Sequence, residues 1–176
     1  VLATQNPIEQ EGTYPLPEAQ IDRFLLKSVV PYPSVEEEAK MLSLIENEEK
    51  LDVKKIIDLD DILDLQSSVK KVFVDDKIKD YIIRLVHATR NPIEYKLDSL
   101  KEKISFGASP RASIAFMNVS KVIALINGRD FVIPEDIKEV ADDILRHRVI
   151  LTYEAEADGV KVEDVIEEII NNIQVP

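Results

Sequence analysis

The helical spacing of apolar residues narrows the possible folds of this chain more than any other feature of its sequence. Residues three and four positions apart lie on one face of a helix, so this spacing is typical of amphipathic helices that bury one side. The spacing dominates after residue 34 and predicts a helical bundle over residues 34–176. The stretches that follow it are Val35–Ile45, Ile62–Phe73, Ile78–Val86, Ile114–Ile126, Ile137–Leu145 and Val162–Ile173.

One of these helices is expected at the centre of the bundle. Ser109–Pro110 supplies a cap and a proline in the first turn, and Asn127–Gly128 is a typical end. Between them the chain is apolar around most of the helix circumference, which indicates burial on several sides, with Val122 and Leu125 inside. The β-branched and aromatic run Val149–Tyr153 predicts a short strand.

The first 33 residues follow a different pattern. A short apolar run ends at a polar tip, and Asn6–Pro7 is a turn signal. After an irregular stretch, Pro17–Glu18 opens a short helix, with a carboxylate at the positive end of the helix dipole. The helix leads into the apolar run Phe24–Leu26. The predicted order is therefore strand, polar tip, loop, short helix and strand.

Composition and charge exclude several classes of function. The 34 acidic and 22 basic residues give a formal net charge of −12, which opposes non-specific binding to nucleic acid or anionic lipid. There is no cysteine, so neither a disulfide nor a thiolate zinc site can form. No apolar run approaches the roughly 18 residues of a membrane span. We expect a cytoplasmic protein that neither binds nucleic acid nor inserts into a membrane.

Three sequence blocks carry a family resemblance: ATQNP at 3–7, EGTYPLPEAQ with DRF at 11–24, and GASPRA at 107–112. In this order and at these intervals they resemble the MoxR family of AAA+ ATPases, and the resemblance covers nearly the whole chain. It implies a mainly α fold, in which a helical lid domain at 34–176 follows a remnant of the α/β P-loop ATPase core at 1–33. In the family, the strand with the phosphate loop lies between the two short strands of this remnant. Both should therefore lack a neighbour here.

Two residues of the first blocks match functional positions of the family. Asn6 matches sensor 1, where a carboxamide can donate to a phosphate oxygen or orient a water; a plain Asn-Pro turn is the alternative. Arg23 matches the arginine finger, whose guanidinium stabilises charge on the γ-phosphate held by the neighbouring subunit. The alternative for Arg23 is a surface ion pair with Asp22 or Glu18.

Arg111 lies in the first turn of the predicted central helix. A cation there opposes the helix dipole, and a bound phosphate would resolve this conflict. The resemblance implies the sensor 2 role for Arg111, and pairing with a nearby carboxylate is the alternative. His147 and Arg148 end a helix that opens at Pro134, where the dipole favours cations, so we assign them no part in the chemistry.

Two motifs of a P-loop ATPase are missing from the sequence. It contains no Gly-x-x-x-x-Gly-Lys-Ser/Thr motif and no apolar strand that ends in Asp-Glu. The main phosphate cradle and the magnesium carboxylates are therefore absent. We expect the chain to be a piece of a longer protein and to be inactive as an ATPase on its own.

For the complete protein the resemblance implies ATP and Mg²⁺ as cofactors and hydrolysis in a homo-oligomeric ring, expected to be a hexamer. The ring would remodel or mature client proteins in a chaperone-like way, including proteins with von Willebrand A domains. Two alternatives stay open: a non-enzymatic helical module for oligomerisation or partner docking, and another AAA+ relative such as a magnesium-chelatase-like or MCM-like subunit. The sensor and finger motifs argue against the first. The acidic balance disfavours a DNA motor, and the EGTYPLPEAQ block fits MoxR better.

Overall fold

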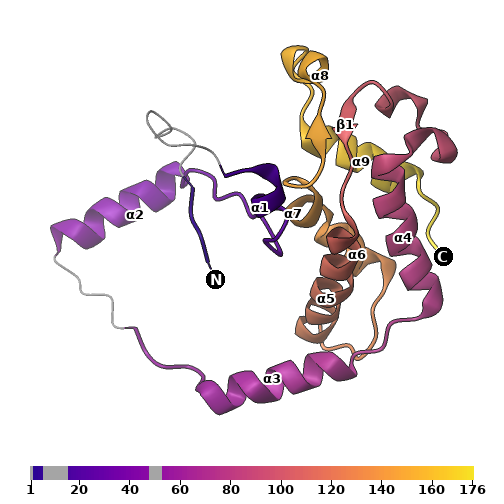
Figure 1. Ribbon diagram of the computed structural model, residues 1–176. Coiled ribbons are helices and arrows are strands. Elements are labelled where there is room, and N and C mark those ends of the chain that lie inside the picture. Colours follow the sequence, from indigo (N-terminus) through magenta and orange to yellow (C-terminus); the bar gives the residue numbers. More distant parts are fainter. Residues whose placement is uncertain (1, 6–15, 48–52) are drawn as a thin grey trace.

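The computed structural model describes residues 2–5, 16–47 and 53–176 (Figure 1). In chain order its α-helices are α1 Glu18–Ile21, α2 Val35–Glu46, α3 Leu59–Lys71, α4 Asp76–Arg90, α5 Pro110–Ile126, α6 Pro134–Glu139, α7 Ala141–Leu145, α8 Tyr153–Ala157 and α9 Val162–Asn172. Two 3₁₀ turns, η1 Pro92–Tyr95 and η2 Asp98–Leu100, follow α4, and β1 Ile104–Phe106 pairs antiparallel with β2 Ile150–Leu151. The mainly helical fold confirms the predicted class.

The core of the bundle forms where α4 and α5 pack together and against α6, α7 and α9 (Figure 1). The apolar stripe predicted for α4 is buried along its whole length. Its largest members, Tyr81 and Leu85, are fully enclosed together with Phe116 of α5. Burial of apolar surface against several helices is the main source of stability in such a bundle.

The predicted central helix is confirmed, because α5 runs from Pro110 to Ile126 and packs on α3, α4, α6 and α7. It ends in a Schellman motif at Gly128, which has a φ of +70°. The prediction that Val122 is inside was wrong, since this residue is 39% exposed. Val122 lies two positions from both Ser120 and Ala124, which are buried, so it points to another side of the helix.

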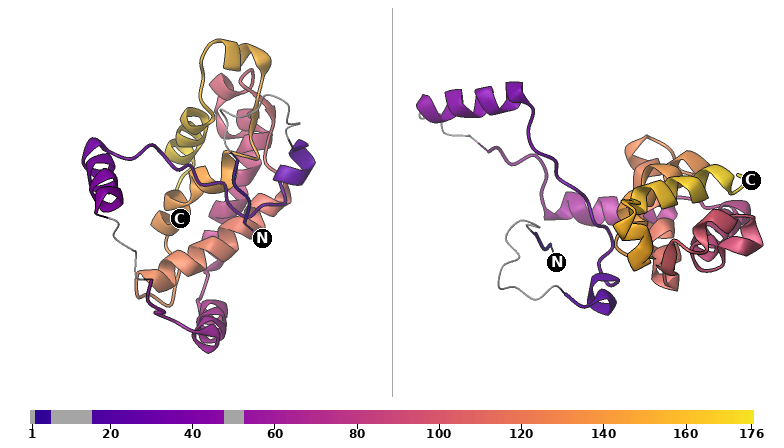
Figure 2. Two further views of the ribbon diagram at one scale, coloured as in Figure 1. Left: turned by 90° about the vertical axis from the view of Figure 1, so that its left-hand side faces the viewer. Right: turned by 90° about the horizontal axis from the view of Figure 1, so that it is seen from above.

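Helices α2 and α3 form where predicted; α2 lies apart from the bundle, whereas α3 contacts α5 (Figure 2). Neither helix has a buried residue among those described, and α2 exposes its apolar stripe, including Leu42 and Ile45. The end of α3 is tied to the bundle at Phe73, whose N–H donates to the Asp130 carbonyl at 2.8 Å. The domain boundary after residue 33 stays a prediction.

The two strands predicted in the first 33 residues do not form a sheet in the described part of that segment. Residues 2–5 and 26–34 have no regular secondary structure, whereas the short helix predicted between them is present as α1. A strand exists only with a hydrogen-bonded partner, and the strand expected between these two is not in this chain. The strand predicted at Val149–Tyr153 does form as β2, because β1 supplies its partner.

Candidate functional site

The structure describes two of the three predicted site residues. Asn6 lies outside the described residues. Arg23 is exposed, in the turn directly after α1, and Arg111 is exposed at the start of α5. Residues around Arg23 and Arg111 meet, although they lie almost 90 positions apart in the sequence, because Asp22 contacts the beginning of α5.

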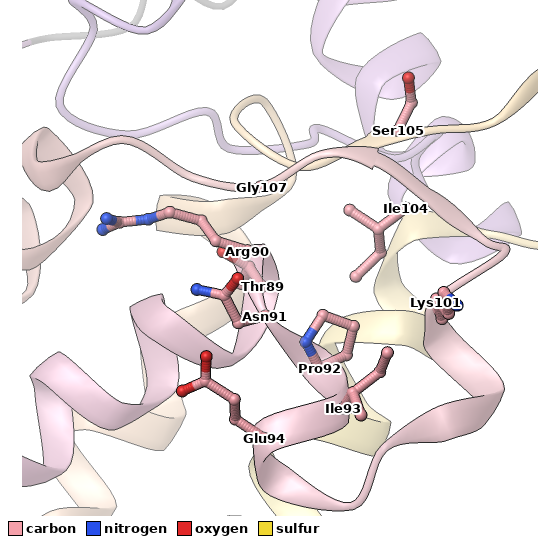
Figure 3. Close-up of a pocket in the computed structure, with 10 residues that line it drawn as sticks. All are labelled: Thr89, Arg90, Asn91, Pro92, Ile93, Glu94, Lys101, Ile104, Ser105 and Gly107. Atoms are coloured by element: carbon pink, nitrogen blue, oxygen red, sulfur yellow. The ribbon is translucent and has the colours of Figure 1, made fainter.

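The loop that leads into α5 is held against the end of α4. The Ala108 N–H donates to Thr89 Oγ1 at 2.9 Å, and Arg90 Nε donates to the Ala108 carbonyl at 2.8 Å. Figure 3 shows Gly107 passing over Thr89 and Arg90, beside a cavity of about 340 Å³ between α4 and β1. These contacts fix the loop immediately before Ser109, and so fix the position from which α5 and Arg111 begin.

Gly107 is the one position in this loop where a side chain cannot fit. A Cβ atom there would lie 2.4 Å from the Thr89 carbonyl oxygen and 2.7 Å from the Arg90 nitrogen, both of which belong to backbone. Replacing Gly107 with alanine should therefore lower the stability of the lid by about 1–3 kcal/mol, as overpacking does. Thermal melting measures this, with Ser105→Ala as the control, because Ser105 lines the same cavity and is exposed. Equal melting of the two variants would contradict the close approach.

Ser109 serves both its own helix and the segment next to Arg23. Its Oγ accepts from the Arg111 N–H at 3.2 Å, which caps α5. The same hydroxyl donates to the carboxylate of Asp22, whose two oxygens both lie 2.9 Å away. The cap of the central helix is thus joined to the turn that carries Arg23.

The Asp22 carboxylate also binds two arginines of the bundle. Arg111 Nη1 lies 3.0 Å from Oδ2, and Arg148 Nε lies 3.2 Å from Oδ1. Burial raises the pKa of Asp22, but hydrogen bonds from Arg111 and Ser109 and the charge of Arg148 outweigh it, so this pKa lies below its ordinary value. Asp22 is therefore ionised at neutral pH. We call Asp22, Ser109, Arg111 and Arg148 the Asp22 anchor.

Arg148 differs most from what the sequence predicted. We expected Arg148 to be a cation at a helix end with no other role. Its side chain is instead only 2% exposed, and it lies in the interior just after the end of α7. Besides the carboxylate of Asp22, the guanidinium of Arg148 donates to the main-chain carbonyls of Asp22, Phe24 and Leu25. A buried guanidinium requires such partners, because each unpaired donor would cost the full loss of hydration.

His147 contributes to the same contact. Its Nε2 lies 3.0 Å from the Phe24 carbonyl oxygen, which can only accept, so Nε2 carries the proton. Burial lowers the pKa of His147 below its ordinary value, in spite of this hydrogen bond. The imidazole is accordingly neutral at pH 7 and acts as a donor to the segment after Arg23.

The ion pair that was the alternative role forms for Arg111 but does not form between Arg23 and Asp22. Arg111 does pair with a carboxylate, that of Asp22, yet its side chain stays 55% exposed and open to a further ligand. Asp22 was also a possible partner for Arg23, but its carboxylate faces Arg111 and Arg148 instead. The side chain of the other candidate, Glu18, lies outside the described part of the chain.

Sequence reasoning missed Asp22, Ser109 and Arg148 as parts of the site. One signal was present for Arg148. It lies between the apolar Leu145 and Val149, where the apolar spacing of the helix predicts a residue that faces the interior. Other features are absent from the described ranges: no three or more potential metal ligands gather there, and no helix has the length and apolar character of a membrane span.

Comparison with known proteins defines the class first. The family model described as AAA lid domain matches residues 99–169, and the model described as ATPase family associated with various cellular activities (AAA) matches residues 1–26. The crystal structure of an ATPase candidate from Cytophaga hutchinsonii superimposes with a TM-score of 0.93 at 46% identity, covering 98% of this chain and 52% of that one. The fold is thus that of an AAA ATPase lid with an adjoining piece of the core.

Curated relatives narrow the class further. Chaperone MoxR1 of Mycobacterium tuberculosis is 46% identical over 176 residues, all of this chain and 46% of the relative. YeaC of Bacillus subtilis is 43% identical over 177 residues, with 52% of the relative covered, and Protein MoxR of Methylorubrum extorquens is 26% identical over 189 residues, with 55% covered. The chain belongs to the MoxR family of AAA+ ATPases. It spans about half the length of these relatives.

Proposed function

We propose that this chain provides the lid and the sensor and finger residues of an ATPase that binds and hydrolyses ATP with Mg²⁺ in a homo-oligomeric ring. The observation that carries the proposal is the Asp22 anchor. It joins the turn of Arg23 to the start of α5, where Arg111 keeps an exposed guanidinium. Two residues that match nucleotide-contacting positions of the family are thus held on one connected structure.

The start of α5 suits a phosphate group. Arg111 adds an exposed guanidinium to the positive dipole end of a helix of 17 residues, and both features favour an anion. Bound ATP would supply the phosphoryl group, and Arg111 would hold the phosphates against the lid of its own subunit. Arg23 would stabilise charge at the γ-phosphate of the next subunit, and Asn6 would orient the attacking water.

The Mg²⁺ ligands belong elsewhere in the proposed enzyme. The described residues contain no cluster of three or more potential metal ligands, and the sequence has no phosphate-loop motif. Since the chain covers about half of its relatives, the phosphate loop and the magnesium carboxylates would come from the other half. Mg²⁺ would there neutralise phosphate charge, as it does in P-loop NTPases generally.

The work of the ring is proposed to be chaperone-like. The relative from Mycobacterium tuberculosis is called a chaperone, which supports the remodelling or maturation of client proteins. The ring is proposed to be a hexamer that works in the cytoplasm. Clients with von Willebrand A domains are part of this proposal. A second candidate function, a non-enzymatic docking module, is favoured by the exposed apolar residues of α2 and is distinguished by its independence of Arg23.

Turnover of ATP tests the proposal. The complete protein should hydrolyse ATP with Mg²⁺, and a variant without the phosphate-loop lysine should not. The 176-residue chain alone should show no turnover, because it lacks the phosphate loop. A complete protein without activity in its assembled state, or sustained hydrolysis by the purified 176-residue chain, would refute the proposed function.

A further inference from the structure

The main-chain carbonyls around Arg23 are held by one buried guanidinium. Arg148 Nη2 lies 3.3 Å from the Asp22 carbonyl oxygen and also donates to that of Phe24, so it binds the residues immediately before and after Arg23. Its Nη1 lies 3.3 Å from the Leu25 carbonyl oxygen. With Nε on the Asp22 carboxylate at 3.2 Å, the guanidinium fastens the whole turn to the lid.

Besides Ser109 and Arg111 at the start of α5, two further groups that contact this turn come from the same short region as Arg148. His147 Nε2 lies 3.0 Å from the Phe24 carbonyl oxygen, and the Lys27 N–H donates to the Asp143 carbonyl at 2.8 Å. Asp143 belongs to α7, which ends at Leu145, and His147 and Arg148 come two and three residues after that end. The turn of Arg23 is therefore fixed to the end of α7, although the family models place the two in separate regions, residues 1–26 and 99–169.

We propose that Arg148 is the positioning residue of Arg23 and that it makes the finger move with the lid of its own subunit. This inference rests on the proposed function. A group that stabilises a transition state in a neighbouring subunit must be placed to within about 1 Å, because such a displacement can cost about 100-fold in rate. Arg23 is exposed, so the placement of its guanidinium depends on a fixed backbone, and Arg148 fixes the backbone on both sides.

An arginine suits this role better than a lysine. Its planar fork carries five donors in fixed directions, and Arg148 uses them on one carboxylate and several carbonyls at once. A lysine at this position would keep the charge opposite Asp22 but would present one compact head that cannot span the turn. Replacement of Arg148 by lysine therefore removes the fork and keeps the charge.

The experiment compares ATP affinity with turnover in the complete protein. Arg148→Met and Arg148→Lys should both lower the turnover rate, the former by about 10- to 100-fold, and both should leave ATP affinity unchanged. Arg146→Met is the matched control. Arg146 is 12% exposed and pairs with Asp143 and Glu163 of the lid, so its loss reports a general weakening of the same region.

Mixed rings separate positioning from a merely structural role. Arg148→Met subunits have an intact nucleotide pocket, and subunits without the phosphate-loop lysine still present a well-placed Arg23. Rings that contain both should recover part of the activity, as rings mixed with Arg23→Ala subunits should. Arg111→Ala subunits should show no such recovery, because their defect lies in their own pocket. Arg148→Lys replaces Arg148→Met in these rings if the latter does not fold.

Several outcomes would overturn the inference. Wild-type turnover in both Arg148 variants would do so, as would a fall in ATP affinity that matches the fall in rate. Failure of Arg148 variants to recover in mixed rings, while Arg23→Ala recovers, would reduce Arg148 to a structural residue. A wild-type protein without ATP turnover would instead refute the proposed function, and the inference with it.

Discussion

Replacing Arg23 with alanine in the complete protein should abolish most ATP hydrolysis and leave ATP binding nearly intact. An arginine finger contacts the charge that develops in the transition state, so its loss raises the barrier without weakening the ground-state complex. Fingers in other NTPases contribute about 10³- to 10⁵-fold in rate. Steady-state turnover and the dissociation constant of ATP, measured on the same preparation, report the two effects separately.

The proposed arrangement of subunits in a ring gives this prediction its control. Arg23→Ala subunits mixed with subunits that lack the phosphate-loop lysine should recover part of the activity, because each type supplies what the other has lost. Arg23→Lys should recover little on its own, since an ammonium does not reproduce the planar fork. If mixed rings form but stay inactive, and Arg23→Ala weakens ATP binding as Arg111→Ala does, Arg23 acts within its own subunit and the finger assignment is wrong.

The largest expected effect on stability comes from Phe116. This side chain of α5 is fully buried, so truncation to alanine should destabilise the lid by about 3–5 kcal/mol through lost burial and the remaining cavity. Val122 lies on the same helix but is 39% exposed, so Val122→Ala should cost less than about 1 kcal/mol. Amide hydrogen exchange along α5 measures the free energy of local opening in both variants. Comparable losses would mean that α5 is rotated from the orientation described.

Most of the fold could be predicted from local signals in the sequence. The helices of the bundle follow from apolar spacing, and α5 begins and ends at its predicted capping residues. The orientation of α5 could not be predicted, because a helix that is apolar on nearly every side does not indicate which residues face its neighbours. The helix predicted from Pro134 is interrupted at Val140, with φ −101° and ψ 2°, although its apolar residues are buried as expected.

The candidate site was predictable only in part, because it depends on contacts between distant residues. Motif resemblance identified Arg23 and Arg111, and their roles stay predictions. The carboxylate between the arginines was visible in the sequence as Asp22, but nothing local indicated that it would face Ser109 and Arg148. Arg148 was misinterpreted because a cation at a helix end already has a sufficient local explanation in the dipole.

The Asp22 anchor has a practical consequence for anyone who recombines parts of related proteins. A chimera joined at residue 33 would take Asp22 and the carbonyls of Phe24 and Leu25 from one parent, and Ser109, Arg111 and Arg148 from the other. Every contact of Asp22 within the anchor would then cross the junction between parents. A junction placed before Asp22 would keep the turn and its lid together, and the exchanged unit would carry its own finger.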